Sequence, residues 1–253
     1  MAQLKGRVAW VTGAGSGIGE AAARALADVG ARIVLTGRRE APLTQLARRI
    51  GAAGGEAHVR PADLTDAPSV AGIGRFIDDT FGRLDILVNN AGANIIEREW
   101  HRLAPQAIAE VIRANLESAF YCVTVALPLM RRQKDGVLIH TASMAGRFVA
   151  PVSGAAYTAA KHGVVAMSHS INMEECMNGI RSTAICPGEV ATPLLDQRPA
   201  PPSAGDRAHM LKPEDCADLI RYIACLPPHV CINEVLITPT WNRGYLAAVA
   251  RRG

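Results

Sequence analysis

The sequence predicts an α/β protein with a single doubly wound parallel sheet of about seven strands, in a three-layer α/β/α arrangement. Short apolar runs alternate with longer helical patterns along the chain, and this alternation is typical of parallel sheets. A glycine-rich turn joins the first apolar run to the first helical pattern. No linker, charge block or internal repeat divides the chain, so we expect one domain over residues 1–253.

The first half of the chain supplies four predicted strands and three helices. Apolar runs predict strands at 8–11, 32–36, 57–59 and 84–88. The first predicted helix, 20–29, is rich in alanine and is followed by Gly30, a typical C-terminal stop. Two further helices are expected at 42–50 and 68–81, and each begins at a proline.

The second half continues the alternation. Helices are expected at 105–115, 116–130, 157–177 and 215–225, and strands at 136–141, 180–185 and 230–238. Residues 193–212 hold four prolines and little periodicity. We interpret them as a lid over a bound substrate, and a merely mobile surface loop is the alternative. Residues 241–253 form a tail.

Composition limits the classes of function. Hydrophobic residues make up 49% of the chain and charged residues 20%, so a large core can be buried. The formal net charge is only +4, and arginine pairs such as Arg131-Arg132 are scattered, which argues against a nucleic-acid interface. No run of about 20 apolar residues occurs, so we expect no membrane span.

Cysteine usage indicates the compartment. The cysteines at 122, 176, 186, 216, 225 and 231 form no C-x-x-C motif and no zinc-ligand spacing. We therefore expect reduced thiols in a cytoplasmic protein and no metal site. The N-terminal stretch has no long apolar run before the first glycine turn, so it does not match a signal peptide.

The first glycine turn predicts a dinucleotide site. Backbone amides at a helix N-terminus attract anions, and glycines let a pyrophosphate approach the backbone. The turn lies between a predicted strand and a predicted helix, so we favour nucleotide binding over a purely structural tight turn. The candidate residues are Thr12, Gly13, Gly15, Ser16, Gly17, Ile18 and Gly19.

The end of the second predicted strand indicates which nucleotide binds. An acidic residue that would hold the adenosine ribose diol is absent there, and Gly37, Arg38 and Arg39 follow the strand instead. Guanidinium groups would hold a 2′-phosphate, so we expect NADP(H) rather than NAD(H). The alternative is that both arginines begin a solvated helix and that Glu40 reaches the ribose.

Polar residues after the third and fourth strands extend the predicted crevice. Asp63, followed by Leu64, either bonds the adenine amino group or caps the next turn. Asn90, Ala91 and Gly92 follow the fourth strand, where ligand crevices form in parallel sheets, although an ordinary loop is the alternative.

Tyr157 and Lys161 are the candidate acid/base pair. Their spacing of four residues puts them one turn apart on one helix face. A nearby ammonium favours the phenolate and lowers the tyrosine pKa from about 10. Ser143 follows the fifth strand and could bind the same substrate oxygen. Asn115 lies in an apolar stretch and is either a satisfied core amide or part of this site. Alone, a Tyr/Lys pair also occurs by chance on solvated helices.

Together these motifs closely resemble the short-chain dehydrogenase/reductase family over about Lys5 to Thr238. The resemblance implies a Rossmann-type sheet of seven strands. It implies that Tyr157 is the general acid/base, that Lys161 lowers its pKa and bonds the nicotinamide ribose, and that Ser143 orients the substrate oxygen. The other matching positions are Asn115, whose backbone would hold a water, and the nicotinamide-binding segment with Pro187, Gly188, Val190 and Thr192.

We therefore expect an NAD(P)-dependent oxidoreductase, with NADP preferred, acting on a small carbonyl compound or secondary alcohol. One alternative is a cofactor-binding regulatory protein of the same fold without turnover. Another is a hydrolase with Ser143 as nucleophile and His140 or His162 as base. The resemblance also implies a homo-oligomer, a tetramer or dimer, built through the helices 116–130 and 157–177.

The candidate substrate contacts are 93–96, 147–152 and 194–210. Arg98, Arg147 and Arg198 lie within or next to these segments and could hold an acidic group of the substrate. We favour the interpretation that all three side chains are solvated. The tail departs from the family pattern, which often has Asp-Gly-Gly near the end of the last strand.

Overall fold

A computed structural model describes residues 3–250, and within them seven strands form one parallel sheet. The strand order is β3-β2-β1-β4-β5-β6-β7, so the direction of winding reverses between β1 and β4. The predicted doubly wound α/β fold is confirmed. The strands are β1 (Val8–Thr12), β2 (Arg32–Gly37), β3 (Glu56–Pro61), β4 (Ile86–Asn89), β5 (Gly136–Thr141), β6 (Ile180–Pro187) and β7 (Glu234–Ile237).

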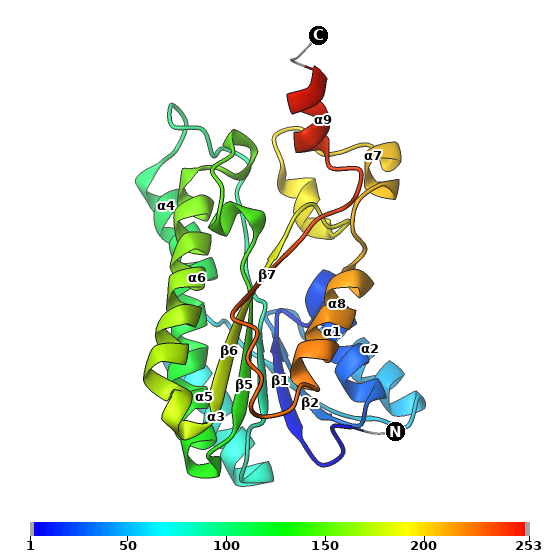
Figure 1. The fold of residues 1–253 in the computed structure, drawn as a ribbon, viewed down its shortest axis with the longest axis vertical. Helices are drawn as coiled ribbons and strands as arrows, with labels where there is room; N and C mark the ends of the chain where they lie inside the picture. Colours follow the sequence, from blue (N-terminus) through cyan, green and yellow to red (C-terminus); the bar gives the residue numbers. More distant parts are fainter. Residues whose placement is uncertain (1–2, 251–253) are drawn as a thin grey trace.

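Helices cover both faces of the sheet (Figure 1). One face carries α1 (Gly17–Asp28), α2 (Glu40–Ala52) and α8 (Pro213–Ala224). The other carries α3 (Ala67–Phe81), α5 (Ser118–Gln133) and α6 (Ala155–Glu175), and α4 (Pro105–Ile112) lies beside α6. The short helices α7 (Ala204–Ala208) and α9 (Arg243–Ala250) lie beyond the carboxyl ends of the strands. No helix of the described chain is long and apolar enough to cross a membrane.

The strands read as continuous apolar runs because both of their faces are buried. Along β1, Ala9 and Val11 pack under α1 and α8, whereas Val8 and Trp10 pack under the helices of the opposite face. This period of two assigns each strand residue to one of two cores.

Several predicted boundaries differ from the structure. The helices predicted at 105–115 and 116–130 are joined through a π-helical segment, Arg113–Glu117, which spans the predicted boundary between them. Only β7 of the predicted strand 230–238 is paired as a strand. Residues 230–233 lie beside β6 and contact it through individual hydrogen bonds, such as the one from Thr183 Oγ1 to the Ile232 carbonyl. The irregular segment 193–212 contains a 3-10 helix, Pro193–Gln197, and α7. The tail contains α9, while residues 251–253 lie outside the described part.

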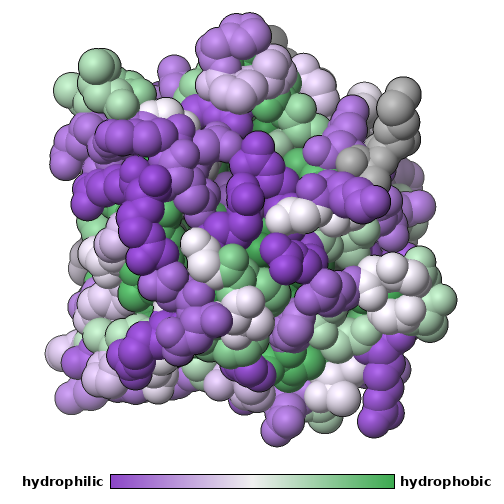
Figure 2. All heavy atoms as spheres, turned by 90° about the horizontal axis from the view of Figure 1, so that it is seen from below, coloured by the Kyte–Doolittle hydropathy of each residue, from purple (hydrophilic) through white to green (hydrophobic). Residues whose placement is uncertain are grey.

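The amino ends of the strands are held by a buried carboxylate. Asp85, just before β4, accepts the Val8 N–H at 2.8 Å and the guanidinium groups of Arg7 and Arg83, each at 2.6 Å. The molecular face opposite α7 and α9 is largely hydrophilic, with apolar residues interspersed (Figure 2). The cleft described next lies at the other end of the sheet.

Candidate active site

A cleft opens at the carboxyl ends of β1, β4, β5 and β6, beside the reversal of strand order, where α/β sheets bind ligands. Its volume is about 280 Å³. A second hollow of about 780 Å³ extends toward β2 and β3 and shares five lining residues with it, Gly13, Ser16, Ala91, Gly92 and Asn94. Because they share these residues, the two hollows form one groove.

The structure brings nearly all residues predicted from the sequence into this groove. The lining set is Gly13, Gly15, Ser16, Gly17, Ile18, Gly37, Arg38, Arg39, Asp63, Leu64, Asn90, Ala91, Gly92, Asn115, Ser143, Tyr157, Lys161, Pro187, Gly188, Val190 and Thr192. Thr12 and Gly19 do not line it; both are buried behind it.

Thr12 supports the groove from beneath. Its Oγ1 accepts the N–H groups of Asn90 at 2.9 Å and Ala91 at 3.0 Å, and donates to the Val88 carbonyl at 3.3 Å. Gly19 is equally constrained, because a Cβ there would lie 2.4 Å from the Gly13 carbonyl oxygen. Thr12 therefore supports the segment after β4 through hydrogen bonds, whereas Gly19 allows close packing against the glycine turn.

The glycine turn fits a pyrophosphate. Gly13 and Gly17 have φ of +62° and +56°, a region that side chains disfavour. Ser16 is the N-cap residue of α1, but its side chain makes no capping hydrogen bond. The first amides of α1 thus keep their donors for an anion in the groove.

The far end of the groove carries positive charge. Arg38 and Arg39 line it, are exposed, and form no ion pair within residues 3–250. Asp63 accepts two hydrogen bonds from Thr65, and these bonds, with the charge of Arg38, lower its pKa. Asp63 therefore caps its turn, as the structural alternative predicted, and lines the groove as well.

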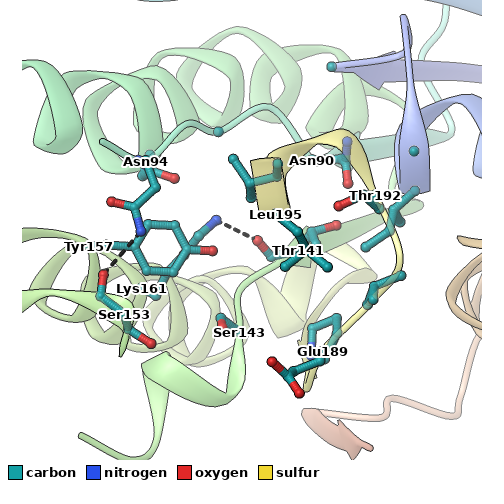
Figure 3. Close-up of a pocket in the computed structure, with 18 of the residues that line it drawn as sticks. Asn90, Asn94, Thr141, Ser143, Ser153, Tyr157, Lys161, Glu189, Thr192 and Leu195 are labelled. Carbon is teal, nitrogen blue, oxygen red and sulfur yellow. Dashed lines mark hydrogen bonds between the residues drawn. The ribbon is translucent and has the colours of Figure 1, made fainter. Parts of the chain in front are cut away.

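Tyr157 and Lys161 share one face of α6 and line the cleft with Ser143 (Figure 3). Gly154, with φ of +77°, is the N-cap residue of α6 and places Tyr157 in its first turn. Ser143 follows β5 and caps a 3-10 turn by accepting the Ala145 N–H at 3.1 Å. The Lys161 Nζ lies 5.5 Å from the centre of the Tyr157 ring.

Burial dominates the ionisation of this pair. It raises the pKa of Tyr157 to about 12, while the Ser143 hydroxyl and the cations Arg198 and Arg98 act in the opposite direction. Burial also lowers the pKa of Lys161 to about 8. The net pKa of Tyr157 is therefore raised and not lowered, contrary to the expectation from its spacing to Lys161: the phenol loses more solvation than the Ser143 hydroxyl and the charges of Arg198 and Arg98 restore.

Asn115 lies in the π-helical segment and is 1% exposed. Its amide nitrogen donates to the carbonyls of Ala93 at 2.6 Å and Val111 at 2.8 Å, while its Oδ1 has no partner within residues 3–250. A Cβ on Gly92 would lie 2.6 Å from that oxygen and 3.5 Å from Lys161 Nζ. Asn115 is thus a core amide whose free oxygen faces the site.

Two arginines near the cleft are not solvated, contrary to the interpretation favoured from sequence. Arg98 is 5% exposed, and the Arg198 side chain is 14% exposed and paired with Glu189. Arg147, by contrast, is solvated and pairs with Glu234 outside the cleft. No periodicity surrounds Arg98 in the sequence, so only the folded chain reveals its burial.

Fold and groove together define a dinucleotide-binding α/β protein, and comparison with known proteins identifies its family. A family model described as short chain dehydrogenase matches residues 7–202. An uncharacterized oxidoreductase of Staphylococcus epidermidis is 33% identical over 94% of this chain and 100% of its own length. The chain therefore belongs to the short-chain dehydrogenase family of oxidoreductases.

Solved structures agree with this assignment. A metagenomic short-chain oxidoreductase in complex with NADP is 33% identical, with a TM-score of 0.82 over 95% of this chain and 100% of that protein. An alcohol dehydrogenase from the archaeon Thermococcus sibiricus, complexed with 5-hydroxy-NADP, is 28% identical, with a TM-score of 0.84 over 94% of this chain and 98% of that one.

Proposed function

We propose that the chain is an NAD(P)-dependent oxidoreductase that prefers NADP(H) and interconverts a carbonyl compound and a secondary alcohol. One observation carries the proposal: Ser143, Tyr157 and Lys161 lie on a cleft whose other end is the glycine turn before α1. A nicotinamide nucleotide held in the groove would supply the hydride, whereas the protein supplies orientation and a proton.

Tyr157 is the proposed general acid/base. Its hydroxyl gives a proton to the carbonyl oxygen during reduction and takes one from the alcohol during oxidation. Ser143 is proposed to hold the same oxygen by a hydrogen bond. Lys161 places positive charge beside the phenol and binds the nicotinamide ribose, and the backbone of Asn115 holds a water that connects Lys161 with solvent.

The preference for NADP(H) is supported by the charge at the far end of the groove. Arg38 and Arg39 form no ion pair among the described residues and line the hollow beside Gly37. A 2′-phosphate there would gain charge-assisted hydrogen bonds. The NADP in one similar structure and the 5-hydroxy-NADP in another agree with this choice.

The organisation around the site is also part of the proposal. Residues 1–253 form one domain, and 193–212 act as its lid, because Leu195 and Arg198 of this segment line the cleft.

The proposed homo-oligomer, a tetramer or dimer, is supported by exposed apolar side chains on α5 and α6, such as Phe120 and Met173. The cytoplasmic location stays a prediction from the cysteine pattern.

A Ser-His hydrolase is the weaker candidate. His140 is fully buried, its ring nitrogens have no partner within residues 3–250, and burial lowers its pKa to about 3. His162 uses its Nδ1 at 2.9 Å from the Thr158 carbonyl. Neither imidazole is hydrogen-bonded to Ser143, so neither activates that hydroxyl.

Turnover tests the proposal. The purified protein is mixed with NADPH and a panel of ketones and aldehydes, and NADPH consumption is followed by absorbance. We expect turnover that falls by about 10²- to 10⁴-fold in Tyr157→Phe. Tyr222→Phe, which alters an exposed tyrosine on α8, is the matched control and keeps wild-type rates. Cofactor binding without any turnover would favour the regulatory alternative, and a fully active Tyr157→Phe would exclude Tyr157 as the acid.

A further inference from the structure

Arg98 carries an uncompensated charge in the wall of the cleft. It is 5% exposed, although arginine is rarely fully buried unless it is paired. Among residues 3–250 no carboxylate forms an ion pair with it. Its hydrogen bonds go to backbone carbonyls, from Nη1 to Val152 at 2.9 Å and from Nη2 to Gln197 at 2.5 Å. Carbonyls satisfy donors but leave the charge unneutralised.

The guanidinium also has donors to spare. Arginine presents five N–H groups, and the two bonds to Val152 and Gln197 use only part of them. The Nε of Arg98 is buried and has no partner within the described chain. A buried donor without a partner is unfavourable, and a buried charge without a counterion more so. Arg98, which lines the cleft, carries both of these unfavourable contributions to the free energy.

Arg98 packs against the start of α6, the helix that carries Tyr157. A Cβ on Gly154 would lie 2.7 Å from the Arg98 Cβ, so glycine at 154 leaves room for the arginine stem. Gly154 is the N-cap residue of α6, three residues before Tyr157. Arg98 also acts on the phenol, since its charge and that of Arg198 favour ionisation of Tyr157.

The cleft as a whole favours an anion. Its charged lining residues are Arg98, Lys161 and Arg198 on the positive side and Glu189 on the negative side. Glu189 is shared, because it binds Arg198 and also Arg243, whose Nε lies 2.8 Å from the carboxylate. That single carboxylate therefore cannot neutralise the cations around the reaction centre.

We propose that Arg98, with Arg198 beside it, binds the carboxylate of a short-chain oxo acid or hydroxy acid. The inference rests on the proposed function and names its substrate class. A planar guanidinium matches a carboxylate in geometry and charge. The cleft volume of about 280 Å³ must also admit the nicotinamide, so the acid is small. In reduction the substrate carbonyl carbon gains hydride from NADPH and its oxygen gains the proton of Tyr157. The products are the hydroxy acid and NADP⁺, and the carboxylate is unchanged.

The alternative is that Arg98 has a purely structural role as a clamp, a side chain that holds two turns of the chain together. Its two carbonyl bonds join the 151–153 turn to the 193–197 turn of the lid. A clamp would affect acidic and neutral substrates equally, whereas a carboxylate site discriminates between them. The decisive quantity is therefore the ratio of affinities for an acid and its uncharged ester.

The first experiment measures binding without turnover. Each of three oxo acids, 2-oxobutanoate, 3-oxobutanoate and 4-oxopentanoate, and its methyl ester are titrated calorimetrically into the protein saturated with NADP⁺, which cannot reduce them. We expect at least one acid to bind about 10- to 100-fold more tightly than its ester. The preferred acid also reports the distance between the carbonyl and the carboxylate. If no acid exceeds its ester, the inference is overturned.

Variants then assign the effect to Arg98. Arg98→Gln should abolish the acid preference and Arg98→Lys should keep part of it, while Arg147→Gln, a cation outside the cleft, should keep all of it. If Arg98→Gln does not fold, Arg198→Gln replaces it, with a smaller loss expected because Glu189 already pairs with Arg198. Equal weakening of acid and ester would make Arg98 a clamp and overturn the inference.

Turnover separates this inference from the function on which it rests. With NADPH, reduction of the ester but not of a preferred acid would leave the oxidoreductase standing and overturn the carboxylate site. Acid-selective binding without reduction of any carbonyl compound would support the site and count against the proposed function.

Discussion

Lys161 donates a hydrogen bond of 2.8 Å from its Nζ to the carbonyl oxygen of Thr141, the last residue of β5 (Figure 3). The lysine is 4% exposed, so this bond is made away from solvent. Because Ser143 follows Thr141 by two residues, the same strand end holds the lysine and leads to the serine. The ammonium is thus positioned by the sheet itself, next to the phenol of Tyr157.

This buried ammonium should control the pH dependence of reduction. Burial lowers the pKa of Lys161 to about 8 and raises that of Tyr157 to about 12. In the proposed mechanism, reduction needs the charged lysine and the protonated tyrosine. The tyrosine keeps its proton across the neutral range, so kcat/KM for reduction should be flat below pH 8 and fall as Lys161 loses its proton above it. Initial rates at saturating NADPH across buffers of constant ionic strength measure this profile.

Lys161→Arg is the matched variant, since arginine stays charged in this range. Its overall rate should be lower, because the longer side chain does not fit the bond to Thr141, but the fall near pH 8 should disappear. A wild-type profile that stays flat to pH 10, or a variant that retains the same inflection, would show that Lys161 does not set the profile.

The charge at the ribose end of the groove predicts the effect of Arg38→Ala. If Arg38 holds a 2′-phosphate, the variant should bind NADPH about 10-fold or more weakly and leave NADH binding nearly unchanged. Fluorescence titration of both nucleotides measures this preference. Arg48→Ala removes an exposed arginine on α2 outside the groove and is the control. Equal binding of the two nucleotides to the wild type would contradict the interpretation of Gly37-Arg38-Arg39.

The strands and the glycine turn could be predicted because their signals are local. The apolar run that forms β1, the glycines behind it and the alanine-rich α1 follow from periodicity and turn chemistry. The π-helical segment Arg113–Glu117 could not be predicted, since its sequence is compatible with an ordinary helix and its extra residue per turn depends on packing around Asn115.

The same distinction between local sequence signals and tertiary contacts applies to the site. Tyr157, Lys161 and Ser143 could be proposed from spacing and family resemblance. The burial of Arg98 could not, because it arises where three distant segments, around 98, 154 and 197, meet. Equally, Thr12 could be placed beside the glycine turn from its position at the end of β1, but its support of the turn at Asn90 depends on a tertiary contact.

Two glycines of α3 should respond oppositely to alanine. A Cβ on Gly74 would lie 2.2 Å from Val125 Cγ1 on α5, whereas one on Gly72 meets nothing closer than 3.7 Å, the Arg75 side chain. Gly74→Ala should therefore destabilise the protein by about 1–3 kcal/mol through overpacking. Gly72→Ala should stabilise it by about 0.5–1 kcal/mol, because glycine is costly within a helix. Urea unfolding measures both, and a stabilising Gly74→Ala would contradict the close α3–α5 contact.

Apolar side chains on the outer helices predict self-association. Phe120 on α5 is 46% exposed and Met173 on α6 is 82% exposed. Light scattering after gel filtration should show a dimer or tetramer, and Phe120→Asp or Met173→Asp should shift it toward monomer. Trp100→Asp alters an equally apolar exposed residue outside these helices and is the control. A monomeric wild type would exclude the predicted interface. Dissociation by Trp100→Asp alone would place the interface away from α5 and α6.

The last prediction concerns Asp85, which ties the strand starts together. Burial opposes its ionisation, but the bonds from Arg83, Arg7 and the Val8 amide outweigh burial, so its pKa is lowered. A carboxyl whose pKa is lowered on folding stabilises the protein above its unfolded pKa of about 3.9, and this stabilisation is lost as pH falls through the folded value. Asp85→Asn should therefore lower the free energy of unfolding by about 2–4 kcal/mol at pH 7, because it leaves buried donors without a charged acceptor.

The deficit of Asp85→Asn should begin to shrink below about pH 4, where the carboxyl of the unfolded wild type takes up its proton, and should continue to shrink as pH falls toward the lower pKa of the folded state. Urea unfolding of both proteins from pH 7 down to pH 3.5 measures the difference. Asp78→Asn is the control, because Asp78 pairs with Arg132 at the surface, where ion pairs contribute little. If the two variants are equally stable at pH 7, or if the Asp85 deficit is independent of pH, the carboxylate does not hold β1 and β4 in the way that its hydrogen bonds indicate.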